Sequence, residues 1–133
     1  MIEILNIHPQ CLMGAAWLFL ALAIGHVVAD FPLQGVFLST AKNRNLQLSD
    51  DLNTKSPRGV WLHAMSAHSL IHCGVVWLIT GSVVLGLIEF VLHWVIDSAN
   101  CETWVGLNTD QLLHYGCKIV YVALIYYGVI HLG

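Results

Sequence analysis

Four long apolar stretches restrict what this 133-residue chain can fold into. Each comes close to the roughly 20 residues that an α-helix needs to cross the hydrocarbon core of a bilayer. A helix satisfies its own backbone hydrogen bonds in lipid, whereas an open strand cannot. We therefore predict an all-α membrane protein, a four-transmembrane-helix bundle with up-down topology, forming a single domain over residues 1–133. The predicted spans are 11–31, 60–80, 82–97 and 110–131.

The composition agrees with a membrane protein. Only 10% of the residues are charged and 57% are hydrophobic, whereas soluble domains carry about 25% charged residues. The formal net charge is −3, so the chain lacks the basic footprint of a nucleic-acid-binding protein. Membrane lipids are the expected partners, and assembly into a homo-oligomer stays open.

The basic residues predict the orientation. Lys42, Arg44, Lys55 and Arg58 lie in the connection between the first two spans, and Lys118 lies in the first turns of the last span. In an antiparallel bundle of four helices, all five fall on one side. Basic residues favour the cytoplasmic side of a membrane. We therefore expect a protein of the bacterial inner membrane with both termini in the periplasm.

Each predicted span carries one pair of polar residues spaced four apart. This spacing puts both side chains on one helix face, and it is the spacing by which a helix offers two ligands to one metal site. All four pairs fall in the cytoplasmic half of the predicted bundle. The pairs are His26 and Asp30, His68 and His72, His93 and Asp97, and Asp110 and His114.

These pairs indicate a metal site near the cytoplasmic side. A lone carboxylate at the centre of a span costs about 2.5–3.5 kcal/mol, and facing carboxylates repel one another. A divalent cation would remove both penalties. Eight ligands exceed the three or four that one zinc takes, so we expect two or more ions, zinc favoured and iron or manganese compatible. Otherwise some Asp residues orient His ligands, or the bundle is a proton relay.

Further residues are candidates for catalysis. Glu89 stands one turn deeper than His93 on the same face, and it is a further ligand, a general base or a neutral hydrogen-bonded residue. Asp30 and Asp97 are the candidates for bridging two ions.

Other polar residues are candidates for substrate binding or for orienting ligands. Lys118, Arg44 and Arg58 could attract an anionic substrate group, although Lys118 could instead extend its amine to the membrane surface. Gln34 and Gln111 border the polar pairs, where they could orient ligands.

Four segments around these pairs resemble the bacterial and phage membrane-protein family known as domain of unknown function 3307. They are GHVVADFPLQ (25–34), AHSLIHCG (67–74), LHWVIDSAN (92–100) and TDQLLHYG (109–116). The resemblance implies a fold and candidate ligands but no activity. More distantly, the ligand pattern looks like that of membrane-bound metal-dependent hydrolases, which are similar to zinc phospholipase C and to zinc nucleases with multi-zinc sites between helices.

The sequence therefore favours a metal-dependent hydrolase, with a phospholipid or another phosphoester as substrate at the cytoplasmic leaflet. The alternative is a structural or accessory membrane protein whose metal only holds the bundle together. An ion pathway would need polar residues through the whole membrane, but the outer halves of the predicted spans are almost wholly apolar.

Overall fold

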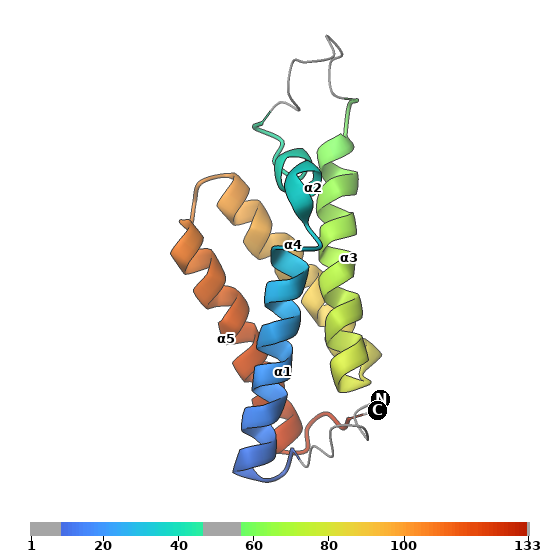
Figure 1. Cartoon of the computed structure of the whole chain (residues 1–133), viewed down its shortest axis with the longest axis vertical. Coiled ribbons are helices and arrows are strands. Elements are labelled where there is room, and N and C mark those ends of the chain that lie inside the picture. The colour runs from blue at the N-terminus through green and yellow to red at the C-terminus, as the bar shows by residue number, and fades with distance from the viewer. Residues whose placement is uncertain (1–8, 47–56, 133) are drawn as a thin grey trace.

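The structure is a computed structural model, and it describes residues 9–46 and 57–132. These residues form five helices and no strand: α1 (Leu12–Asp30), α2 (Gly35–Ala41), α3 (Val60–Thr80), α4 (Val83–Cys101) and α5 (Leu107–Tyr126). The four long helices alternate in direction, and the short α2 lies beside α3 at one end of the bundle, here called the α2 end (Figure 1). The all-helical fold is confirmed.

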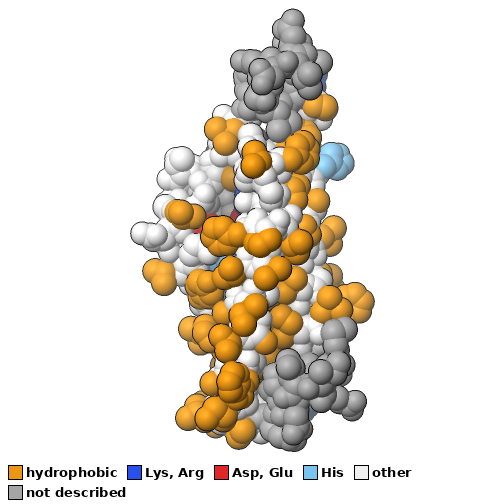
Figure 2. Space-filling model, viewed as in Figure 1, with side chains coloured by type: hydrophobic (Ala, Val, Ile, Leu, Met, Phe, Trp, Pro, Cys, Tyr) orange, Lys and Arg blue, Asp and Glu red, His pale blue; other side chains and the backbone are white. Residues whose placement is uncertain are grey.

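Three of the helices, α1, α3 and α4, are long and apolar enough to cross a membrane. Hydrophobic side chains are spread over most of the face shown in Figure 2. Among the described helices, α5 is the long one that does not reach this hydropathy, although it has 20 residues. Its first twelve residues include Asp110, Gln111, His114 and Lys118. Four apolar spans were predicted, but only three of the described helices are apolar enough to count as spans by their composition.

The helices differ from the prediction in three places, the first being that α5 spans Leu107–Tyr126 where a span over 110–131 was predicted. The third span was expected to end at residue 97, but α4 continues to Cys101, and the Ser98 hydroxyl donates to the Trp94 carbonyl oxygen at 2.7 Å. Helix α2 was not predicted, because seven residues are too few to show a helical hydrophobic period. Lys55, which the orientation argument used, lies outside the described residues.

A two-residue connection holds α3 against α4. Gly81 adopts a φ of 70°, a left-handed conformation that glycine tolerates best, and its N–H donates to the Trp77 carbonyl oxygen at 2.7 Å. Ser82 then caps α4, because its hydroxyl oxygen accepts from the Leu85 N–H at 3.3 Å. The tight turn makes α3 and α4 an antiparallel hairpin.

The interior of the bundle has two different halves. The half near the α3–α4 turn holds an apolar core made of Leu18, Leu22, Val76, Leu85, Tyr121 and Ile125. The half toward the α2 end buries polar and charged residues from all four long helices. Burying polar groups is costly unless they find partners, so this polar half is where a functional site is expected.

Gly25 allows α1 to approach α3 closely, and this gives a first prediction. A Cβ at Gly25 would lie 2.5 Å from Val75 Cγ1 and 2.9 Å from Ile79 Cδ1. We expect Gly25→Ala to lower the free energy of unfolding in detergent by about 1–3 kcal/mol, because the side chains of Val75 and Ile79, or the helices themselves, must shift. Gly74→Ala is the control, since a Cβ there meets nothing within 4 Å. Equal effects of both substitutions would contradict close packing at Gly25.

Candidate metal centre

The i,i+4 spacing of the four pairs brings all eight predicted ligands into the polar half. Helix α1 contributes His26 and Asp30, and the other long helices contribute one pair each. The five imidazoles are at most 1% exposed. The Asp30 side chain is 11% exposed and is the most accessible of the three carboxylates. The eight residues, here called the His/Asp cluster, are His26, Asp30, His68, His72, His93, Asp97, Asp110 and His114.

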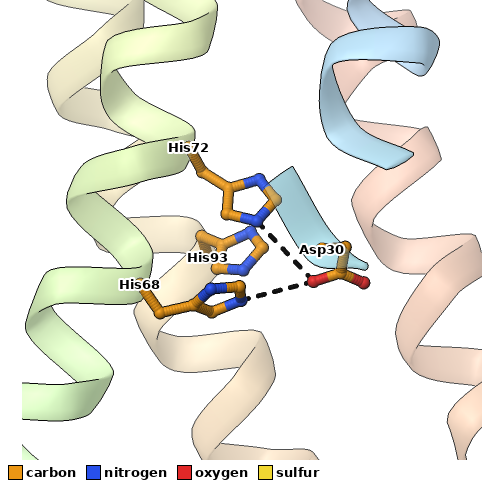
Figure 3. A group of neighbouring side chains, drawn as sticks. All are labelled: Asp30, His68, His72 and His93. Atoms are coloured by element: carbon orange, nitrogen blue, oxygen red, sulfur yellow. Dashed lines mark ion pairs between the residues drawn. The ribbon is translucent and has the colours of Figure 1, made fainter. Parts of the chain in front are cut away.

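One ligand group centres on Asp30 (Figure 3). Its Oδ1 lies 3.3 Å from His68 Nε2 and 3.6 Å from His72 Nε2. Its Oδ2 accepts a hydrogen bond from Gln111 Nε2 at 2.8 Å, so the predicted orienting role of Gln111 has a geometric basis. Asp30, His68, His72 and His93 offer ligand atoms within 4.8 Å of one another. This group has the donor number of a tetrahedral zinc site.

A second group centres on Asp97. Its Oδ1 lies 3.1 Å from His114 Nε2 and 3.5 Å from His93 Nε2, and its Oδ2 lies 3.5 Å from His68 Nε2. In two further sets the ligand atoms lie within 4.8 Å of one another. One set is Asp97, Asp110 and His114, and the other is His26, His93 and His114. Because His93 and His114 are shared between sets, the groups form one continuous cluster.

The imidazole rings lie against one another, and two of their nitrogens are hydrogen-bonded: His26 Nε2 to Gln111 Oε1 at 3.3 Å and His114 Nε2 to Asp97 Oδ1 at 3.1 Å. The rings of His72 and His93 stack with centroids 3.5 Å apart, and those of His93 and His114 with centroids 4.2 Å apart. Six buried imidazole nitrogens lack a hydrogen-bond partner within the described part of the chain: His26 Nδ1, His68 Nδ1 and Nε2, His72 Nε2, and His93 Nδ1 and Nε2.

Unpartnered nitrogens at this density need an explanation. Buried side-chain polar atoms are nearly always hydrogen-bonded, and an unsatisfied group costs about 1–3 kcal/mol. Neutral imidazole nitrogens and carboxylate oxygens are the donors that zinc, iron and manganese accept. The donor set of the His/Asp cluster therefore fits divalent transition metals.

The family comparison applies to the whole cluster. A family model described as "Protein of unknown function (DUF3307)" matches residues 18–131. The chain belongs to the DUF3307 family. This confirms the resemblance found in the sequence, and the matched range includes all eight residues of the His/Asp cluster. Comparisons with curated proteins and with solved structures found no match.

Next to the cluster, this DUF3307 protein buries a charged unit formed by Glu89, Lys118 and Tyr121. The Lys118 ammonium donates to Glu89 Oε1 at 2.5 Å, and the Tyr121 hydroxyl donates to Glu89 Oε2 at 2.8 Å. All three residues are 1% exposed. Glu89 Oε1 also lies 3.5 Å from His93 Nδ1.

This placement changes the interpretation of two predicted site residues. Lys118 does not extend to the membrane surface, and its amine is held by Glu89. Both oxygens of Glu89 accept hydrogen bonds, from Lys118 and from Tyr121, which disfavours the predicted role of a general base. Tyr121, which the sequence analysis missed, follows Lys118 by three residues on the same helix face.

The two arginines considered for substrate binding lie outside the cluster. Arg44 Nε donates to Glu102 Oε1 at 2.7 Å, and its guanidinium stands 5.8 Å from the centre of the Trp61 ring. The hydrogen bond with Glu102 raises the pKa of Arg44, and the same bond lowers the pKa of Glu102. Arg58 is exposed just before α3.

Lys42 is the cation that contacts the cluster, and the sequence analysis did not single it out. It follows α2 directly, and its Nζ donates to Asp97 Oδ2 at 2.5 Å and to Gln34 Oε1 at 2.6 Å. No local spacing links residue 42 to residue 97. The placement of α2 against α3 brings them together.

Proposed function

We propose that this DUF3307 protein is a membrane-embedded, metal-dependent hydrolase of the phosphoesterase type. The observation that carries the proposal is that the set of His26, His93 and His114 shares His93 with the set around Asp30 and shares His114 with the set of Asp97 and Asp110. Ions bound in these sets would therefore lie close together. Clustered divalent ions, when bound, lower the pKa of a coordinated water toward 7 and stabilise the attacking and leaving oxygens of a phosphoester.

We assign the residues of the His/Asp cluster to two ions. Asp30, His68, His72 and His93 would hold one ion, and Asp97 with Asp110 and His114 would hold another. Asp97 is the candidate bridge, because its two oxygens approach imidazoles of different groups. Asp30 is the most exposed carboxylate of the cluster, so a substrate would approach the ions from its side. Zinc is the favoured metal for mixed imidazole and carboxylate ligands.

We also propose that α5 crosses the membrane with the other long helices. Its polar residues Asp110, His114 and Lys118 are buried inside the bundle, whereas Leu112 and Val120 are 71% and 54% exposed. A helix whose outward face is apolar suits lipid even when its mean hydropathy is low. The basic residues near the α2 end would place that end in the cytoplasm of a bacterial inner membrane.

The test is elemental analysis of the protein purified in detergent. We expect two or more transition-metal ions per chain, and we expect chelation to lower the melting temperature, because bound metal at 100 times its Kd adds about 2.7 kcal/mol. The loaded protein should hydrolyse members of a panel of phospholipid and nucleotide phosphoesters, and chelation should abolish that turnover. As a control, His63→Ala should keep the wild-type metal content and turnover, because His63 lies on α3 but is exposed.

The second candidate function is a structural metal site in an accessory membrane protein. The near-complete burial of the five imidazoles favours it, because structural sites are coordinatively closed and catalytic sites keep an open position. Tight metal binding without turnover on any member of the panel would select this candidate. A protein free of transition metal would contradict both.

A further inference from the structure

Lys42 and Gln34 flank α2 and meet at the exposed edge of the His/Asp cluster. Lys42 Nζ donates to Gln34 Oε1 at 2.6 Å and to Asp97 Oδ2 at 2.5 Å, and the Lys42 side chain is 14% exposed. We propose that Lys42, held by Gln34, is an oxyanion-binding residue that receives a phosphoryl group at the cluster. This inference rests on the metal centre of the proposed function and specifies the charge of its substrate.

The second buried lysine shows what a purely structural pairing looks like in this protein. Lys118 is 1% exposed, and its partner Glu89 also accepts a hydrogen bond from Tyr121. The ion pair is therefore fully buried inside the bundle. Lys42 instead reaches the cluster from a separate segment, and its partner Asp97 also faces three imidazoles. Lys42 therefore sits where a bound ligand can replace the carboxylate as its partner.

Charge balance decides what that ligand is. The cluster contains three carboxylates and five imidazoles, which are neutral when they bind a metal. Two divalent ions together with the Lys42 ammonium outweigh the three carboxylates and leave a net positive charge, so the site would attract an anion. Once a metal neutralises Asp97, the ammonium is free to pair with that anion.

A phosphoryl group fits this arrangement. It presents several oxygens, so it can contact metal ions and an ammonium at once, and lysine binds phosphate as a point charge. Apolar side chains in the segment on either side of Gln34 are exposed, namely Phe31 at 62%, Leu33 at 51%, Val36 at 84% and Phe37 at 61%. These residues could lie against acyl chains if the phosphoryl group belongs to a lipid, whereas a free phosphate would leave them unused.

The experiment measures binding of inorganic phosphate to the metal-loaded, full-length protein in phosphatidylcholine nanodiscs, after removal of unbound metal. We expect Lys42→Met to weaken phosphate binding by about tenfold or more, the effect of losing one charge-assisted hydrogen bond, while its metal content stays that of the wild type. Lys42→Arg should retain most of the affinity. Arg44→Gln is the matched control, because Arg44 is paired with Glu102.

A second arm identifies the source of the phosphoryl group. If a lipid supplies it, phosphatidic acid in the nanodiscs should reduce phosphate binding by the wild type more strongly than it reduces the residual binding of Lys42→Met. If the ligand is free phosphate, both lipid compositions should give the same titration. Wild-type phosphate affinity in metal-loaded Lys42→Met would overturn the Lys42 assignment alone. A wild-type sample without metal would overturn the proposed function, and the oxyanion-binding role with it.

Discussion

Replacing Asp97 by Asn is expected to remove most of the transition metal from the purified protein. Asp97 approaches three imidazoles with two oxygens and also accepts from Lys42. Asparagine offers one oxygen and no charge, so it cannot bridge two ions or neutralise their charge. The loss of metal affinity should exceed the roughly 10–100-fold that removal of a ligand's hydrogen-bond partner costs. Elemental analysis after dialysis against a weak chelator measures it.

Two controls separate loss of a ligand from loss of the fold. Glu102→Gln removes a carboxylate that follows α4 directly and is paired with Arg44 outside the cluster, so it should keep the wild-type metal content. Far-ultraviolet circular dichroism should give the same helix content for Asp97→Asn as for the wild type. A folded Asp97→Asn protein that keeps all its metal would show that Asp97 is not a ligand.

The ligand pairs could be predicted because helical geometry is local. A separation of four residues places two side chains on one face of any helix, and the predicted range 60–80 is the range that α3 occupies. The convergence of four such faces followed from a second general fact, that polar residues in a membrane turn toward the bundle interior. Neither inference requires knowing which helices are neighbours in the bundle.

The contacts that depend on tertiary placement could not be predicted. Lys42 meets Asp97 across 55 positions of the chain, and seven-residue α2 gives no periodic signal that would locate it. The pairing of Lys118 with Glu89 was not predicted either, because the two residues lie on different helices. Arg44, a predicted substrate-binding residue of the first connection, pairs with Glu102 instead.

The pairing of Glu89 with Lys118 leads to the largest stability effect that we expect. Lys118→Met would leave the Glu89 carboxylate buried with Tyr121 as its remaining donor. Breaking one side of a buried ion pair costs about 3–5 kcal/mol, because the other charge stays buried without compensation. Glu89→Gln should be destabilising for the same reason, since it leaves the Lys118 ammonium facing a neutral amide. Unfolding of the purified variants in detergent, followed by circular dichroism, measures both effects.

The double variant Glu89→Gln with Lys118→Met separates charge from packing. Removing both charges leaves no uncompensated ion inside the bundle, so the double variant should recover most of the stability that either single variant loses. Arg44→Gln should leave the unfolding transition unchanged, because exposed ion pairs contribute little. Additive losses in the double variant would instead mean that these side chains stabilise the bundle through packing.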